Sequence, residues 1–105
     1  MKDVVAALAK KGCKHILYIY NSLTYSGRHK LDGFRLGIKD LQLPHRTELI
    51  QQIPKTLTDT EALIDRLVTE NIDFDAIITA DDIFAVGAQR AALRHGLNIP
   101  VIGCN

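Results

Sequence analysis

Residues 76 to 88 read AIITADDIFAVGA, an apolar run followed by two carboxylates and then by small and apolar residues. The first four residues are typical of a strand buried on both faces, and the residues from Asp82 onward are typical of a helix that packs closely against a sheet. In an open parallel sheet, small molecules bind in the crevice beyond the carboxyl ends of the strands. Asp81 and Asp82 therefore stand where a ligand is expected, and binding is a stronger hypothesis than catalysis.

The segments around this stretch continue the same alternation of helix and strand. β-prone runs predict strands at residues 15–20, 48–53, 75–79 and 100–103. Apolar residues at helical spacing predict helices from Asp3 to Gly12, from 28 to 41, from Thr58 to Asn71 and from Asp82 to Gly96. Asp3 is expected to cap the first helix, and Thr58-Asp59-Thr60-Glu61 has the form of a capping box for the third.

This order predicts an α/β fold, an open and mostly parallel Rossmann-like sheet of about four strands with helices on both faces. At 105 residues the chain is expected to form one such unit over residues 1–105. Parallel strands all end at one edge of a sheet, so the polar residues after them should be neighbours. The fold therefore predicts that Asn21, Pro54, Asp81 and Asn105 lie close together.

Composition excludes several classes of protein. Hydrophobic residues make up 47% of the chain and charged residues 24%, which is typical of a folded globular domain. The net charge is +1 and no run of like charge is present, so direct nucleic-acid binding is not expected. No segment has the apolar length of a membrane span or the pattern of a signal peptide, so we expect a cytoplasmic protein. Cys13 and Cys104 lack metal-site spacing and are expected to be ordinary buried thiols.

Four short motifs occur in an order that resembles a known family. They are the entry to the first strand (residues 8–16), Lys30-Leu31-Asp32-Gly33-Phe34, Asp82-Ile83-Phe84-Ala85-Val86-Gly87-Ala88 and Gly96-Leu97-Asn98-Ile99-Pro100. Together they resemble the C-terminal subdomain of the effector-binding region in the lactose-repressor (LacI/GalR) family of bacterial transcription regulators, which has the type I periplasmic-binding-protein-like fold. Periplasmic sugar-binding proteins share the second and third motifs.

The resemblance implies a repressor whose effector, a sugar or similar polar molecule, binds in a cleft between two lobes. It implies operator DNA binding through a helix-turn-helix domain outside these residues, a second lobe that is also outside them, and a homodimer that uses the fourth helix. Two departures bear on the effector. Lys30 stands where the family often has arginine, so the planar fork is lost. Asp81 replaces a common asparagine and adds negative charge, which makes anionic effectors less favourable.

The candidate ligand-binding residues are Asp82, Lys30, Arg28, Asn21, Asp81 and Ser22. An ionised carboxylate such as Asp82 can accept hydrogen bonds from two neighbouring hydroxyls of a sugar or polyol. Lys30 or Arg28 can donate from the opposite wall, and the loop from Asn21 supplies an amide and hydroxyls. The alternative for Asp82 is a helix N-cap, and for Lys30 and Arg28 it is a solvated helix face.

Other functions remain open or are disfavoured by the sequence. The chain has no evident nucleophile–base pair, cofactor loop or metal-ligand spacing, so we expect no enzyme activity, no cofactor and no metal site. A lobe of a periplasmic sugar-binding transport protein is the alternative to a regulator. A fragment that folds but binds nothing by itself is a third possibility, since half a cleft leaves one face of a sugar in water.

Overall fold

The computed structural model describes residues 2–21, 25–44 and 46–103, and the side chains of residues 2 and 25–28 lie outside this description. The elements follow one another as α1 (Lys2–Lys10), β1 (Ile16–Tyr20), α2 (Tyr25–Asp40), the 3-10 helix η1 (Thr47–Leu49), β2 (Ile50–Gln52), α3 (Leu57–Thr69), β3 (Ala76–Thr79), α4 (Asp82–Arg94) and β4 (Val101–Gly103). This order confirms the predicted alternation of helix and strand.

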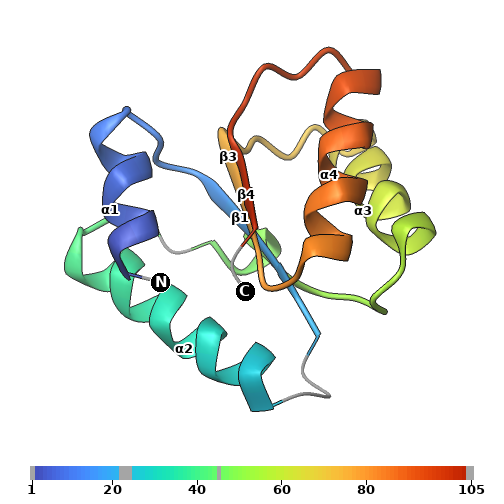
Figure 1. The fold of residues 1–105 in the computed structure, drawn as a ribbon. Helices are drawn as coiled ribbons and strands as arrows, with labels where there is room; N and C mark the ends of the chain where they lie inside the picture. The colour runs from blue at the N-terminus through green and yellow to red at the C-terminus, as the bar shows by residue number, and fades with distance from the viewer. Residues whose placement is uncertain (1, 22–24, 45, 104–105) are drawn as a thin grey trace.

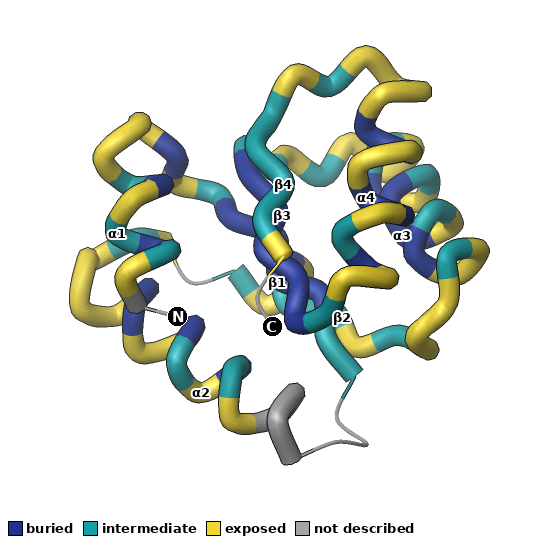
Figure 2. The backbone as a smooth tube through the Cα atoms, in the orientation of Figure 1, coloured by how far each residue is buried: buried dark blue, intermediate teal, exposed yellow. Residues whose placement is uncertain are grey.

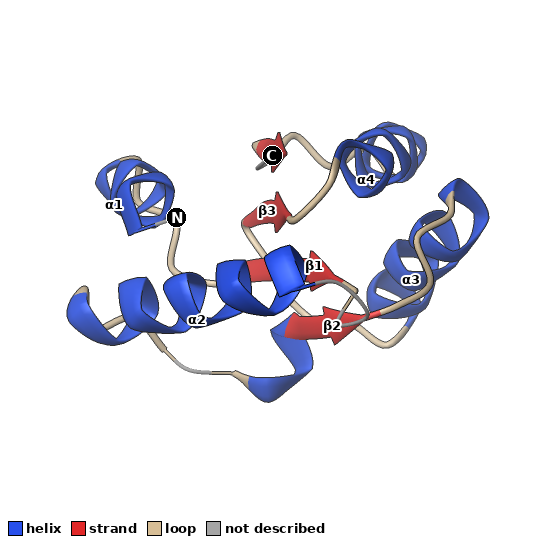
Figure 3. Cartoon of the chain, turned by 60° about the horizontal axis from the view of Figure 1, so that its bottom comes forward, coloured by secondary structure: helices blue, strands red, loops and turns tan. Residues whose placement is uncertain are grey.

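The strands form one parallel sheet of four strands in the order β2-β1-β3-β4. In the register, Tyr18 of β1 lies between Ile50 of β2 and Ile78 of β3, and Ile78 pairs with Ile102 of β4. Helices α1 and α2 cover one face of the sheet, and α3 and α4 cover the other (Figures 1 and 3). The predicted α/β fold with helices on both faces is therefore confirmed.

The core consists of two apolar layers, one on each face of the sheet. Successive side chains of a strand point to opposite faces, and β1 illustrates this alternation. Ile16 and Tyr18 pack with α1 and α2, where Phe34 stacks on the Tyr18 ring with centroids 4.8 Å apart. Leu17 and Ile19 pack with α3 and α4. The two central strands are buried on both faces (Figure 2), which explains why β1 and β3 are nearly continuous apolar runs.

The structure corrects two boundaries on the α1–α2 face. Asp3 does not cap α1 but lies inside its first turn, where a carboxylate still interacts favourably with the helix dipole. Helix α2 begins at Tyr25 instead of residue 28 and ends at Asp40, so Leu41 lies beyond it and is exposed. The helix stops because Gln42 adopts a left-handed conformation, φ 55°, and the Leu43 N–H then donates to the Ile38 carbonyl at 3.0 Å.

Two further boundaries change around β2 and α3. Residues Glu48 and Leu49, which were predicted as strand, belong to η1, so β2 is only three residues long. Helix α3 starts at Leu57, and Thr56 is its N-cap in place of the predicted Thr58. The Thr56 Oγ1 accepts a hydrogen bond from the Asp59 N–H at 3.0 Å and donates to the Asp59 carboxylate at 2.6 Å.

Gly87 allows α4 to approach α3 more closely than any other residue would. A Cβ atom at this position would lie 2.7 Å from the Thr60 Cβ and 3.3 Å from the Leu57 carbonyl oxygen. We expect Gly87→Ala to lower the free energy of unfolding by about 1–2 kcal/mol in urea denaturation, because the overpacking exceeds the gain in helix propensity. Gly37→Ala is the control, since the nearest atoms to its Cβ would be side-chain atoms of Val5 at 3.2 Å, a less severe contact than at Gly87. Equal losses in both variants would contradict this account.

Candidate functional site

The carboxyl ends of three strands are tied together at one edge of the sheet. The Ile53 N–H donates to the Tyr20 carbonyl at 3.1 Å, and the Ala80 N–H donates to the Ile19 carbonyl at 3.0 Å. We call this edge the carboxyl rim and define it by the residues that end or follow the strands: Asn21, Ile53 to Lys55, Ala80 to Asp82, and Gly103. These residues come from four separate segments, so the fold creates the neighbourhood that the sequence predicted for its first three strands.

Asn21 lies where β1 ends, and its side-chain amide spans to the next strand. The Asn21 Nδ2 donates to the Ile53 carbonyl at 3.0 Å. Asn21 is half-buried, so part of the residue is accessible to solvent at the rim. Its backbone position and its amide therefore place hydrogen-bonding groups beside the β2 end.

Lys30 reaches the carboxyl rim from α2. Its ammonium Nζ donates to the Ala80 carbonyl at 3.1 Å, although the two residues are far apart in the sequence. Because the side chain points to the end of β3 and is partly buried, Lys30 is not simply part of a solvated helix face. A lysine ammonium carries three N–H donors, and this position brings them to the turn between β3 and α4.

Asp81 is the N-cap of α4. Its Oδ1 accepts from the Ile83 N–H at 3.3 Å, while its Oδ2 lies 2.9 Å from the Lys55 Nζ. The hydrogen bond and the positive charge of Lys55 hold the pKa of the Asp81 carboxyl below its ordinary value, with a further contribution from the Ile83 N–H. Capping, which the sequence offered as the alternative role for Asp82, thus belongs to Asp81.

Asp82 is the first residue of α4 and is exposed. Its carboxylate lies beside the end of β4, because a Cβ atom at Gly103 would be 3.6 Å from the Asp82 Oδ1 and 3.6 Å from the Thr79 Oγ1. The same Cβ atom would crowd Ala85 at 3.2 Å, whereas its contact with the Asp82 carboxylate would be an ordinary van der Waals contact. Asp82 therefore presents its acceptor oxygens at the rim, between the ends of β3 and β4.

The structure does not reach every predicted site residue. Ser22 and Asn105 lie outside the described residues, and for Arg28 the structure gives only its backbone place in the first turns of α2. Lys55 is a residue of the rim that sequence reasoning missed. The sequence does place Lys55 directly after Pro54, at the end of β2. It does not show that the β2–α3 loop brings the Lys55 ammonium to Asp81.

Lys55 also changes the electrostatic account of the rim. From the sequence, Asp81 was expected to add a negative charge beside the site and so make anionic effectors less favourable. In the structure, Lys55 pairs with Asp81, and Lys30 lies on the neighbouring Ala80 carbonyl. Two lysines and two aspartates thus gather at the end of β3, and their formal charges balance. Such a surface provides strong donors and acceptors without a net charge.

The cap and the ion pair of Asp81 can be separated by two substitutions. We expect Asp81→Ala to lower the free energy of unfolding by about 1–2 kcal/mol, because both interactions are lost. Asp81→Asn keeps a side-chain oxygen for the Ile83 N–H and should cost less than about 1 kcal/mol. Thermal or urea unfolding of the two variants measures the difference, and an equal cost would contradict the capping role.

The pH dependence of the ion pair follows from the lowered pKa of Asp81. A carboxyl whose pKa is lower in the folded state stabilises the fold above its unfolded pKa, ordinarily 3.8. That contribution is lost as pH falls through the lower folded value. The stability difference between the natural protein and Asp81→Asn should therefore be constant from neutral pH to about pH 5 and should diminish below pH 4.

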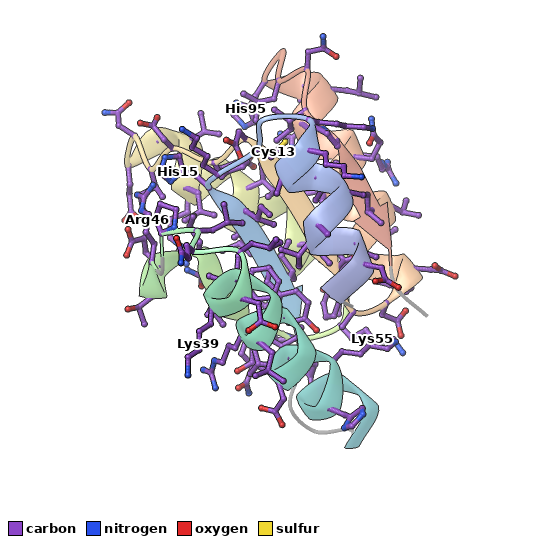
Figure 4. All side chains as sticks on the ribbon, turned by 90° about the vertical axis from the view of Figure 1, so that its left-hand side faces the viewer. Cys13, His15, Lys39, Arg46, Lys55 and His95 are labelled. Carbon is purple, nitrogen blue, oxygen red and sulfur yellow. The ribbon has the colours of Figure 1, made fainter. Side chains whose placement is uncertain are left out.

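Other polar and hollow features lie away from the rim. His15 and Arg46 stand at the opposite end of the sheet from Lys55 (Figure 4), and Arg46 bonds to the Asp73 carbonyl at 3.1 Å. A hollow of about 220 Å³ also lies at that end and is lined by Val68, Asn71, Ile72, Asp73, Phe74 and Leu97. Among the described residues, no three histidines, cysteines or carboxylates gather as metal ligands, and no helix is long and apolar enough to cross a membrane.

Comparison with known proteins identifies the family. Residues 5–105 match the model of the periplasmic binding protein-like domain. The chain belongs to this family. An HTH-type transcriptional regulator from Lachnoclostridium phytofermentans is 38% identical over 107 residues, which cover 98% of this chain and 32% of that protein. The chain thus spans about a third of the length of this curated relative.

Solved structures of LacI-family regulators share the fold of this domain. A LacI-family regulatory protein from Chloroflexus aggregans has a TM-score of 0.85 and 25% identity, with 98% of this chain and 38% of that one covered. A sugar-binding LacI-family regulator from Escherichia coli has a TM-score of 0.86 over 97% of this chain and 38% of its own. Its 21% identity shows a shared fold. The sequence resemblance to the LacI-family effector-binding region is therefore confirmed.

Proposed function

We propose that this chain is one lobe of the effector-binding region of a bacterial transcription repressor, and that it binds an uncharged sugar or polyol at the carboxyl rim. The observation that carries the proposal is the gathering of Asn21, Lys30, Asp81 and Asp82 at one edge of a periplasmic binding protein-like domain. Ligands of open parallel sheets bind at this edge.

The donors and acceptors of the rim suit a ligand rich in hydroxyl groups. Each hydroxyl both donates and accepts, whereas a carboxylate only accepts and an ammonium only donates. Asp82 supplies the acceptor that binds two neighbouring hydroxyls, and Lys30 and the Asn21 amide lie on the flanking segments. We include Ser22 and Arg28 among the proposed ligand-binding residues, because Ser22 follows Asn21 and Arg28 lies two residues before Lys30 in the sequence. The sugar-binding regulator with the same fold supports this ligand class.

Ligand binding is proposed to act through a second lobe that completes the cleft. An effector that binds the closed arrangement more tightly shifts the population toward it. A helix-turn-helix domain elsewhere in the polypeptide would then read this change at operator DNA, as coupling between two sites requires. The named relatives are regulators, which favours a regulatory role over transport and over catalysis. A regulator of this kind would act in the cytoplasm.

Pairing with a second copy through α4 belongs to the same proposal. Ile83, Val86 and Leu93 are exposed, and their spacing places them on one face of this helix. Leu93 is 68% exposed, and an exposed apolar stripe of this kind is more informative than a single exposed side chain. A homodimer of the full-length regulator would cover this stripe.

Calorimetric titration of the full-length protein with a panel of neutral mono- and disaccharides tests the function. We expect saturable binding of at least one member, with stoichiometry of one per chain. The folded state of the protein is checked beforehand by thermal unfolding. A well-folded protein that gives no binding heat with any sugar or polyol of the panel would contradict the proposal.

A further inference from the structure

The ion pair between Lys55 and Asp81 joins two loops of the carboxyl rim. The Lys55 Nζ lies 2.9 Å from the Asp81 Oδ2, which brings the loop after β2 to the turn after β3. The Lys55 side chain is 50% exposed and that of Asp81 33% exposed, so both charged groups face the solvent from which a ligand would arrive. Asp81 also caps α4 through its other oxygen, which fixes the carboxylate in place.

We propose that this ion pair sets the charge selectivity of the carboxyl rim, with Asp81 occupying Lys55 and thereby rejecting anionic ligands in favour of uncharged ones. The inference rests on the proposed function, since it assigns ligand binding to this rim. Without Asp81, the rim would offer an anion the Lys55 ammonium beside the N-terminus of α4, a combination that attracts phosphate and carboxylate groups.

The mechanism is competition for one ammonium group. An incoming phosphate or carboxylate that approaches Lys55 must replace the Asp81 carboxylate or share the cation with it. An uncharged hydroxyl pays no such penalty, because it can accept from a second N–H of Lys55 while the ion pair stays intact. The ion pair therefore lowers the affinity for anionic ligands and leaves the binding of hydroxyl groups unaffected.

Removing the charge of Asp81 should release this restriction without removing the helix cap. Asparagine retains a side-chain oxygen for the Ile83 N–H, so Asp81→Asn changes charge more than structure. A phosphate about 4 Å from the released Lys55 ammonium gains about a factor of five in affinity, even when the attraction is screened as in bulk water. We therefore expect Asp81→Asn to bind inorganic phosphate about fivefold or more tightly than the natural protein.

The test is a titration with inorganic phosphate, followed by NMR through the amide chemical shifts of Asp82 and Ile83. The variants compared with the natural protein are Asp81→Asn, Lys55→Gln and the double variant Asp81→Asn/Lys55→Gln. The gain of Asp81→Asn should vanish in the double variant, because it depends on Lys55. Glu48→Gln is the matched control: it removes one negative charge from the exposed Arg46–Glu48 pair before β2, at the other end of the sheet. It should leave phosphate affinity at the rim unchanged.

Two results would overturn the inference. One is that Asp81→Asn and the natural protein bind phosphate with equal affinity, or that neither binds it detectably. The other is a gain that persists in the double variant, which would assign the effect to net charge and not to Lys55. Failure of the sugar titration would instead remove the proposed function, and phosphate affinity is measured independently of any sugar.

Discussion

Replacing Asp82 by alanine is expected to lower the affinity of the full-length protein for the proposed neutral sugar at least about a hundredfold. The Asp82 carboxylate is exposed at the rim and Asp81 is the residue that caps α4, so in the proposed site the Asp82 oxygens accept hydrogen bonds from the ligand. A hydrogen bond to a charged group contributes about 1.5–3 kcal/mol, and two hydroxyls bound to one carboxylate contribute roughly twice that. Since about 1.4 kcal/mol is a factor of ten, the expected loss is large.

The control for this variant is Asp73→Ala, which removes an exposed aspartate side chain at the opposite edge of the sheet. Calorimetry with the sugar found in the panel should give the natural affinity for Asp73→Ala. Thermal unfolding of both variants should stay close to that of the natural protein. Unchanged sugar affinity in a folded Asp82→Ala protein would remove this residue from the site.

The largest effect on stability is expected for Phe84→Ala. Phe84 lies in the first turn of α4, is 1% exposed, and packs with Leu17, Ile19 and Ile77 in the layer between the sheet and α3 and α4. Truncating a buried phenylalanine to alanine costs about 3–5 kcal/mol, because apolar contacts are lost and a cavity remains. A domain of this size has a total stability of about 5–15 kcal/mol, so the variant should be marginally folded.

Urea denaturation followed by circular dichroism measures this loss. Leu36 of α2 is 58% exposed and lies outside the proposed dimer stripe of α4, which makes Leu36→Ala a control that truncates an exposed aliphatic side chain. We expect this control to change the free energy of unfolding by less than about 1 kcal/mol. A similar small change for Phe84→Ala would mean that α4 is not anchored to the sheet through this ring.

The parallel sheet was predictable because its central strands leave little choice. β1 and β3 are covered on both faces, so their residues are apolar almost without interruption, and this pattern survives in the sequence. The spacing of Leu31, Phe34 and Ile38 similarly predicted α2, since all three are buried on one side of it. The placement of Asp81 and Asp82 at the end of β3 followed directly from these elements.

The start of α3 could not be read from the sequence because two threonines carry the same signal. Thr56 and Thr58 each have an acidic residue three positions later, Asp59 and Glu61. Tertiary packing decides between them. Thr60 is fully buried under α4, where Gly87 makes room for it, and its hydroxyl donates to the Thr56 carbonyl at 2.7 Å. Helical geometry must therefore already hold at Leu57.

Contacts between distant segments were also beyond the sequence. The Asp75 carboxylate accepts from the backbone N–H groups of Lys14 at 2.8 Å and His15 at 3.0 Å, which fixes the entry to β1. Lys55 meets Asp81 in the same way, through the placement of two loops. A single sequence contains the charges of such pairs but not the distances between them. The residues at the strand ends of the rim could therefore be predicted, whereas the contact between Lys55 and Asp81 could not.

A crystal structure of the full-length protein with its bound sugar tests the central claim most directly. We predict hydroxyl oxygens about 2.6–3.2 Å from the Asp82 carboxylate, with Lys30 and Asn21 on the adjoining wall and the Lys55–Asp81 pair intact. A sugar bound elsewhere, for example in the hollow between Val68 and Leu97, or one with no polar contact to the carboxyl rim, would contradict the account.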